Sequence, residues 1–195
     1  MQAAVLGSPV SHSLSPVLHN AAYRALGLSH TYSAIETAES ELGSFLGSVD
    51  SNWLGVSLTM PLKEVAFDYA DTCDELSTLT GAINTLVFGT EVSAFNTDVL
   101  GLVDALAEAG SKQISTGVIF GSGATARSTL VALQRLGATE VNCVARNVSD
   151  VERMAKVANK IGVNFNHTSV SDSAWLTADV VVNTTPMGAL DEIAR

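Results

Sequence analysis

Short apolar and β-branched runs alternate with helical patterns along the chain, and this alternation predicts βαβ units around a mostly parallel sheet. The first series opens with the apolar stretch AAVLG. A helix is expected next, with Ser15 as its N-cap and Pro16 at its first position, ending near Gly27. Further along we expect a strand over 30–35, a helix over 39–46, a strand over 53–58 and a helix that opens after Pro61.

The middle of the chain predicts a β-hairpin followed by a connecting helix. In the stretch INTLVFGTEVSAFNTD, Gly89 and Thr90 suit a two-residue type II′ turn. A strongly amphipathic helix is expected from Val99, and the polar connection GSKQIST comes after it. We therefore place a domain boundary near residue 100.

A second series of strands and helices occupies the rest of the chain. It begins with the strand TGVIF, a glycine-rich turn and a helix running to Gly137. The strand EVNCVAR follows, and the residues from Ser149 to Glu152 have the pattern of a capping box that opens another helix. Strands near 163–168 and 179–183 bring this half to about four strands of a sheet that usually has six.

The two series together predict an α/β protein with two domains, residues 1–100 and residues 101–195, of which the second is incomplete at its C-terminus. Of its 195 residues 47% are hydrophobic, so the chain can bury a sizeable core. Twenty acidic residues against ten basic ones give a formal net charge of −10, and no cluster of Lys and Arg stands out. This charge balance argues against nucleic acid as a partner.

The sequence also bears on the compartment. No apolar run reaches the ~18 residues needed to span a bilayer, and the first residues lack the pattern of a secretory signal, so we expect a cytoplasmic protein without a membrane partner. Cys73 and Cys143 are far apart and match no zinc or redox spacing. We expect both thiols to stay reduced and to serve packing.

The glycine-rich turn has the spacing of a dinucleotide-binding motif. GSGATA matches G-x-G-x-x-G/A between a predicted strand and a predicted helix. The first glycine permits a tight turn, the second lets the backbone approach a pyrophosphate, and the small third residue lets the helix pack closely. An ordinary structural turn is the alternative. We expect phosphates at the helix N-terminus, with contacts from Gly121, Ser122, Gly123, Ala124, Thr125 and Ala126.

The end of the following strand indicates which dinucleotide binds. Folds specific for NAD commonly have Asp or Glu there to hold the ribose hydroxyls, whereas this chain has Ala145, Arg146 and Asn147. A guanidinium suits a 2′-phosphate, so the sequence favours NADP and makes Arg146 and Asn147 candidate cofactor contacts. The alternative is an ordinary solvated arginine.

Polar residues gather at predicted loop positions of the first half. Each has a structural alternative, such as a helix cap, a turn partner or a solvated helix residue. Lys63 lies just past the carboxyl end of a strand, where open α/β sheets place their ligand crevices. Together these positions suggest a hydroxyl-rich ligand: Ser13, Ser15, Thr59, Lys63, Asn84 and the run from Asn96 to Asp98.

At this point the sequence resembles the shikimate dehydrogenases. The motifs that carry the resemblance follow one another in the family's order: GSPVSHSLSPVLHNAAY, GVSLTMPLKE, GAINTL, NTDVLGL, GSGATAR, ARNVSD and VNTTPMG. The resemblance implies an N-terminal α/β substrate domain and a Rossmann-like NADP-binding domain. It also implies reversible NADPH-dependent reduction of 3-dehydroshikimate to shikimate, in aromatic amino-acid biosynthesis.

Residue roles follow from the same resemblance. Ser13 and Ser15 would bind the substrate carboxylate, while Thr59, Asn84 and Asp98 would hold its ring hydroxyls. Lys63 and Asp98 would be the catalytic pair, because an ammonium can stabilise and protonate the alkoxide that forms when the C3 carbonyl is reduced. The family's loop near the nicotinamide corresponds to NTTPMG, which makes Thr184 and Met187 candidate cofactor contacts.

Several positions depart from the family's pattern. Ser57 stands where the family usually has Asn, and Asp150 stands where a basic residue is common, which weakens the local positive field for NADP. Family members also continue for roughly another third of this chain, so we expect an exposed sheet edge and either low stability or association with another chain.

Alternatives therefore remain open: an NAD-dependent quinate/shikimate dehydrogenase, or a non-catalytic ligand-binding fragment of this fold. The chain has no G-x-S-x-G, no H-E-x-x-H and no P-loop lysine. Its four histidines have no metal-ligand spacing and are expected to be structural or solvated. We expect no metal, and either a monomer or a homodimer.

Overall fold

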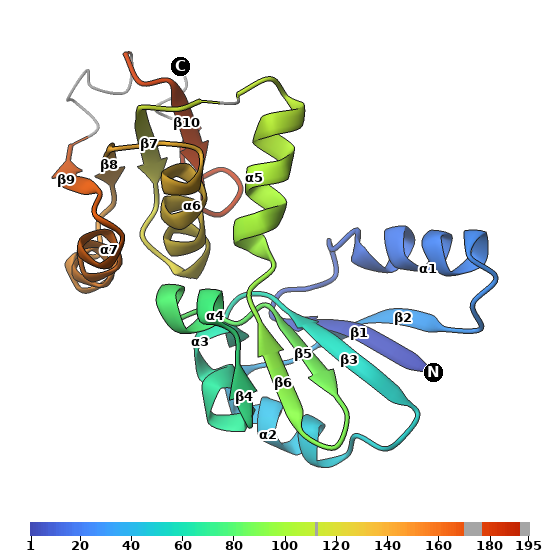
Figure 1. Cartoon of the computed structure of the whole chain (residues 1–195). Coiled ribbons are helices and arrows are strands. Elements are labelled where there is room, and N and C mark those ends of the chain that lie inside the picture. Colours follow the sequence, from blue (N-terminus) through green and yellow to red (C-terminus); the bar gives the residue numbers. More distant parts are fainter. Residues whose placement is uncertain (112, 170–176, 192–195) are drawn as a thin grey trace. The chain divides into compact units, whose positions relative to one another are not determined.

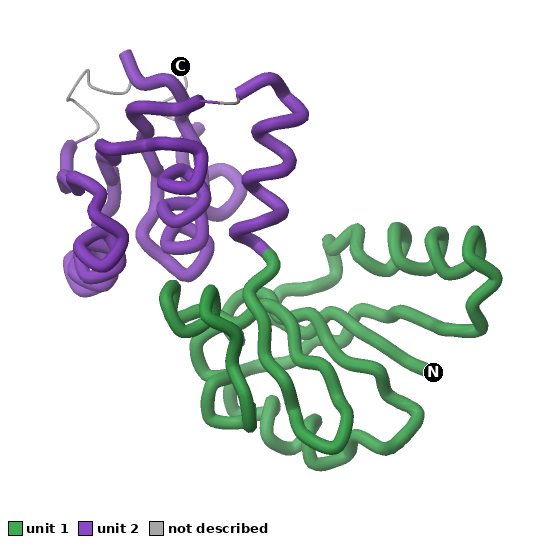
Figure 2. The backbone as a smooth tube through the Cα atoms, in the orientation of Figure 1, with its two compact units in different colours: residues 1–97 green, residues 98–195 purple. Residues whose placement is uncertain are grey.

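The structure, a computed structural model, describes residues 1–111, 113–169 and 177–191. The chain folds into two compact units, Met1–Thr97 and Asp98–Arg195, drawn in green and purple in Figure 2. This division lies close to residue 100, where the sequence predicts the domain boundary. Lys112, in the predicted polar connection, lies outside the described residues.

Unit 1 is an α/β unit whose sheet, within the described residues, has six strands in the order β2-β1-β3-β5-β6-β4 (Figure 1). The strands β2, β1 and β3 run parallel, whereas β5 is antiparallel to both β3 and β6. The strands are β1 (Gln2–Gly7), β2 (Thr31–Glu36), β3 (Trp53–Leu58), β4 (Thr72–Cys73), β5 (Thr85–Phe88) and β6 (Val92–Phe95). The helices are α1 (Ser15–Ala25), α2 (Glu39–Gly47), α3 (Leu62–Val65), the 3-10 turn η1 (Ala66–Tyr69) and α4 (Glu75–Thr80).

Strand β1 is buried on both faces, as expected for a parallel strand between two others. Leu6 belongs to a cluster that includes Leu42 of α2. Val5 points to the other face, where it packs with Tyr32 of β2 and Tyr23 of α1. Figure 1 accordingly shows α1 and α2 on opposite faces of this sheet. The predicted alternation of strands and helices is therefore confirmed in unit 1.

Unit 2 holds, in its described part, a sheet of four parallel strands in the order β10-β7-β8-β9. Helix α6 is buried along most of its length because α5 and α7 both pack against it. The elements are α5 (Asp98–Glu108), β7 (Thr116–Phe120), α6 (Ala124–Arg135), β8 (Glu140–Val144), α7 (Val148–Ile161), β9 (Asn164–Thr168) and β10 (Val180–Asn183). The predicted α/β fold class and the parallel sheet are confirmed.

The start of α1 differs from the sequence prediction. Leu14 occupies the N-cap position, and no side chain caps the helix there. Ser15 is itself the first helical residue, so its hydroxyl cannot act as the cap, and its backbone N–H donates to Ser13 Oγ at 3.3 Å. The predicted Ser15 cap was wrong, although Pro16 does lie in the first turn.

The hairpin of β5 and β6 is confirmed, but its predicted two-residue turn is wrong. Phe88 pairs with Val92, which leaves three residues between the strands. Leu86 and Ala94 face each other in this register, and both are fully buried. A one-residue slip would expose them, so burial of this pair decides the register over the turn preference of Gly89.

The cap of α7 also differs, since Asn147 and not Ser149 occupies the N-cap position. Asn147 Oδ1 accepts from the Ser149 backbone N–H at 3.1 Å and from its hydroxyl at 2.8 Å. Asn147 Nδ2 in turn donates to Asp150 Oδ2 at 2.8 Å. The N-cap thus lies two residues before the predicted one, because an amide side chain satisfies the N–H groups of the first turn equally well.

No helix is predicted from the sequence at α4, although an N-cap residue precedes this helix and a glycine follows it. Asp74 Oδ1 accepts from the Ser77 backbone N–H at 2.7 Å, and Gly81 ends the helix with φ of 62°. Of the two cysteines, Cys143 is buried as expected, whereas Cys73 is exposed and does not serve core packing. Both are free thiols.

Candidate functional site

The loops that follow β1 and β3 are joined at the carboxyl edge of the unit 1 sheet. Ser8 N–H donates to Met60 O at 2.9 Å, and Thr59 N–H donates to Leu6 O at 2.9 Å. A Cβ on Gly7 would overlap Thr59 Cγ2 and come within 2.7 Å of Met60 O, so only glycine permits this approach. The loop of the predicted serines and the loop of Thr59 are thereby held together.

Lys63 lies in the first turn of α3, just beyond the carboxyl end of β3, as predicted. Its carbonyl accepts from the Ile83 N–H at 2.8 Å, and Leu58 N–H donates to the Asn84 carbonyl at 2.7 Å. These two bonds tie the turn that begins β5 to the end of β3. Thr59, Lys63 and Asn84 therefore belong to one edge of one sheet, and all three are partly buried.

The side chain of Asn84 is oriented by its neighbours. Its Nδ2 donates to Thr97 Oγ1 at 2.9 Å, while its Oδ1 accepts from the Thr97 N–H at 3.0 Å and from Thr85 Oγ1 at 2.9 Å. Thr97 ends unit 1, and Asp98 begins unit 2 and helix α5. Asn96 is buried and donates to Thr80 Oγ1 and to Ala82 O, both at 2.9 Å, so it has a structural role.

Ser13 lies in the loop between β1 and α1, Ser15 is the first residue of α1, and Glu36 at the end of β2 holds the loop before them. Glu36 Oε1 accepts from Ser8 Oγ at 2.6 Å, and Oε2 accepts from the Val10 N–H at 3.1 Å. These hydrogen bonds hold the pKa of the Glu36 carboxyl below its ordinary value. Sequence reasoning missed Glu36, because nothing in the local pattern connects it to a loop 26 residues earlier.

Ser57 stands where the resembling family usually has Asn, and a side chain from another strand of the sheet contacts it. The Tyr32 hydroxyl reaches across β1 and donates to Ser57 Oγ at 2.7 Å. The Tyr32 ring stacks on His19 with centroids 4.1 Å apart, and burial raises the pKa of the Tyr32 phenol. The shorter Ser57 side chain is thus supported by a hydroxyl from a neighbouring element.

In unit 2 the two glycines of GSGATA differ in their surroundings. Gly121 has φ of 103°, and a Cβ there would stand 2.5 Å from Thr184 Oγ1. Gly123 is the N-cap of α6 in an extended conformation, and apart from the adjoining residues no described atom comes within 4 Å of the position its Cβ would occupy. The turn itself requires glycine at position 121, whereas position 123 is open on the side where a ligand would approach.

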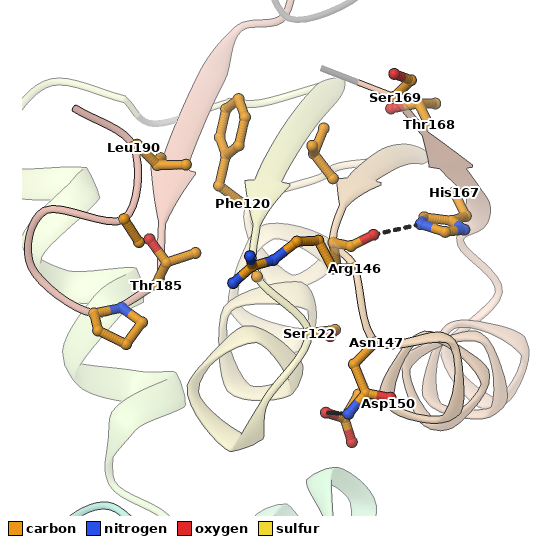
Figure 3. A pocket seen from close by; sticks show the side chains of 15 residues that line it. Phe120, Ser122, Arg146, Asn147, Asp150, His167, Thr168, Ser169, Thr185 and Leu190 are labelled. Atoms are coloured by element: carbon orange, nitrogen blue, oxygen red, sulfur yellow. Dashed lines mark hydrogen bonds between the residues drawn. The ribbon is translucent and has the colours of Figure 1, made fainter. Parts of the chain in front are cut away.

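The glycine turn opens onto a cavity of about 970 Å³ (Figure 3). The carboxyl ends of β7, β8 and β9 surround it, which is the edge where open parallel sheets bind their ligands. Its lining is Phe120, Gly121, Ser122, Val144, Ala145, Arg146, Asn147, Asp150, His167, Thr168, Ser169, Thr185, Pro186, Ala189 and Leu190.

Arg146 follows β8, is exposed, and points into this cavity in Figure 3. His167, at the end of β9, forms a hydrogen bond of 2.8 Å with the carbonyl of Ala145, the residue before Arg146. From the sequence His167 is expected to be structural or solvated, and its place in the cavity wall is not predicted. His167 comes close to Arg146 because β9 pairs in parallel with β8, so that the carboxyl ends of the two strands lie side by side.

The remaining candidate cofactor residues have different positions. Thr184 donates its N–H and its hydroxyl to Phe120 O, at 2.9 and 2.8 Å, and so connects the end of β10 to β7. Met187 is 99% exposed. Asn147 lines the cavity, but its amide is used to cap α7 and to bond Asp150. Cofactor contacts from these three residues stay predictions.

No group of three metal-ligating side chains occurs within the described ranges. The described helices likewise include none that is long and apolar enough to cross a membrane.

Comparison with known proteins agrees with this arrangement. Residues 5–86 match the family described as the shikimate dehydrogenase substrate binding domain. Shikimate dehydrogenase (NADP(+)) of Methanopyrus kandleri is 34% identical over 94% of this chain and 67% of its own length. The chain spans about two thirds of the length of the curated relatives it matches.

Solved structures give the same result. Shikimate dehydrogenase of Mycobacterium tuberculosis has a TM-score of 0.85 at 39% identity, covering 95% of this chain and 70% of that chain. Shikimate 5-dehydrogenase of Thermus thermophilus, solved in complex with NADP(H) and shikimate, has a TM-score of 0.82 at 32% identity, covering 95% and 68%. Sequence and structure agree over nearly the whole chain, which belongs to the shikimate dehydrogenase family.

Proposed function

We propose that the chain catalyses the reversible NADPH-dependent reduction of 3-dehydroshikimate to shikimate. The observation that carries the proposal is the edge of the unit 1 sheet, where Thr59, Lys63 and Asn84 are held by backbone hydrogen bonds between loops distant in sequence. The relatives named shikimate dehydrogenase (NADP(+)) support this activity, and with it a step of aromatic amino-acid biosynthesis.

Substrate binding is assigned to the polar loop residues. Ser13 and Ser15 bind the carboxylate of the substrate through hydroxyl donors, and Glu36 keeps their loop in position. Thr59, Asn84 and Asp98 hold the ring hydroxyls. Asn84 is suited to this role because its bonds to Thr97 and Thr85 determine which way its amide faces.

Lys63 and Asp98 are the catalytic pair in this proposal. When the C3 carbonyl is reduced, negative charge develops on its oxygen, and the Lys63 ammonium stabilises that charge and donates a proton to it. In the oxidative direction neutral Lys63 takes the proton from the hydroxyl. In this proposal Asp98 is the carboxylate that orients Lys63 for the proton transfer.

The cavity of unit 2 fits a phosphorylated dinucleotide. The N-terminus of α6 offers the backbone N–H groups after Gly123 to a pyrophosphate, and Gly123 leaves room for its approach. Arg146 offers a guanidinium for a 2′-phosphate. When bound, NADPH supplies the hydride for the reduction. Contacts of Ser122, Ala124, Thr125, Ala126, Asn147, Thr184 and Met187 with the cofactor belong to this proposal.

The alternative of NAD-dependent quinate/shikimate oxidation is not favoured, since the relatives are named for NADP. A monomer or homodimer and a cytoplasmic location remain predictions from the sequence.

The test is the initial rate of NADP reduction with shikimate, compared between the chain and its Lys63→Ala variant. We expect turnover to fall at least ~10²-fold in the variant while the chain stays folded and NADP still binds, because the group that transfers the proton and stabilises the charge is lost. Lys160→Ala, on the exposed side of α7, is the matched control and should retain the full rate. Unchanged turnover in Lys63→Ala would refute its role, and a folded chain that binds neither shikimate nor NADP would refute the proposed function.

A further inference from the structure

Asp150 lies in the first turn of α7 and lines the same cavity as Arg146 (Figure 3). An uncompensated carboxylate at this point would repel a 2′-phosphate, which carries up to two negative charges. It would also cancel much of the attraction that Arg146 exerts. From the sequence alone, Asp150 therefore argues against selectivity for NADP.

In the structure, two neighbouring side chains donate hydrogen bonds to the Asp150 carboxylate. Asn147 Nδ2 donates to its Oδ2 at 2.8 Å, and the Arg153 guanidinium one turn further along α7 donates to its Oδ1. The two side chains form an ion pair in which Arg153 is 47% exposed and Asp150 only 19%. The carboxylate is thus held from both sides, and its oxygens are already occupied by donors.

We propose that Arg153 is a positioning residue for cofactor selectivity. By pairing with Asp150 it neutralises that carboxylate and keeps its oxygens on α7, so the field at the cavity is set by Arg146 and a 2′-phosphate is accepted. This inference rests on the proposed function for its cofactor.

The formal charges of three side chains near the cavity predict how each variant should behave. Among Arg146, Asp150 and Arg153 the formal charges leave one net positive charge in the natural chain. Arg153→Gln removes that surplus, Asp150→Asn doubles it, and the double variant restores it with neither partner charged. If Arg153 acts through Asp150, the double variant must behave like the natural chain.

The experiment measures dissociation constants, so it does not depend on turnover. The probes are 2′,5′-ADP and 5′-AMP, which differ only in the 2′-phosphate, followed by NADP and NAD. We expect Arg153→Gln to weaken 2′,5′-ADP about 5- to 10-fold and 5′-AMP less than about twofold, as for one screened unit charge near the phosphate. Asp150→Asn should tighten 2′,5′-ADP, and the double variant should return to within about twofold of the natural chain.

Lys156→Gln, which removes a charge from the next turn of the same exposed helix face, is the control and should leave the ratio of the two affinities unchanged. Circular dichroism checks that the total helix content is unchanged in each variant. An unchanged ratio in Arg153→Gln overturns the inference, and so does a double variant as weak as Arg153→Gln, since Arg153 would then contact the phosphate directly. Loss of shikimate turnover with the affinity ratios as expected would count against the proposed function alone.

Discussion

Alanine at the two glycines of the turn after β7 should affect different properties of the protein. Gly121 combines φ of 103° with a Cβ position 2.5 Å from Thr184 Oγ1, so Gly121→Ala meets both backbone strain and overlap. A left-handed conformation costs a residue with a Cβ about 1–2 kcal/mol, and forced repacking costs about 1–3 kcal/mol more. We expect a loss of roughly 2–5 kcal/mol in the free energy of unfolding of unit 2.

Gly123→Ala is the matched comparison. Its backbone is extended, with φ of −75°, and apart from the adjoining residues no described atom lies within 4 Å of the new methyl group. The free energy of unfolding should change by no more than about 1 kcal/mol, because alanine is only a poorer N-cap than glycine. NADP affinity should nevertheless fall about 10-fold or more, because the methyl group stands where the pyrophosphate approaches the backbone.

Thermal unfolding and NADP titration distinguish the two effects. For a unit of this size, about 2 kcal/mol corresponds to a fall in Tm of about 10 °C. Gly121→Ala should show this fall, and Gly123→Ala should show the loss of affinity with a nearly natural Tm. A Gly121→Ala protein as stable as the natural chain would refute the steric reasoning. Natural NADP affinity in Gly123→Ala would refute the assignment of the open side of the turn to the cofactor.

Two further predictions concern titratable groups. The hydrogen bonds from Ser8 and Val10 lower the pKa of Glu36, so their stabilisation is present above the unfolded-state pKa of about 4.3 and is lost as pH falls through the lower folded-state value. Unfolding curves of the natural chain and Glu36→Gln should therefore converge on acidification, and a gap independent of pH would contradict this. Burial raises the pKa of Cys143 to about 11, so iodoacetamide at pH 8 should label exposed Cys73 in the folded protein and Cys143 only after unfolding. Equal labelling of both thiols would contradict the burial of Cys143.

The alternation of apolar runs and helical patterns was sufficient to predict most elements, and β3 coincides with its predicted range of 53–58. Errors fell where several side chains could satisfy the same backbone groups. Asn147 occupies the cap position predicted for Ser149, and α1 begins at Ser15 itself, whose N–H donates to Ser13 Oγ. Local sequence cannot rank such competitors, because their hydrogen bonds have nearly equal energies.

The sequence by itself determined the α/β class, the two-part division, the glycine turn and the family, because these depend on periodicity and on motifs of adjacent residues. Only the tertiary structure brought Glu36 to the serine loop, His167 to the residue before Arg146, and Tyr32 to Ser57. Each of these contacts joins a strand residue to another strand or to a loop near it. The pairing order of parallel strands is decided by burial of whole faces in the folded core, and it leaves no trace in the local pattern of the residues that it brings together.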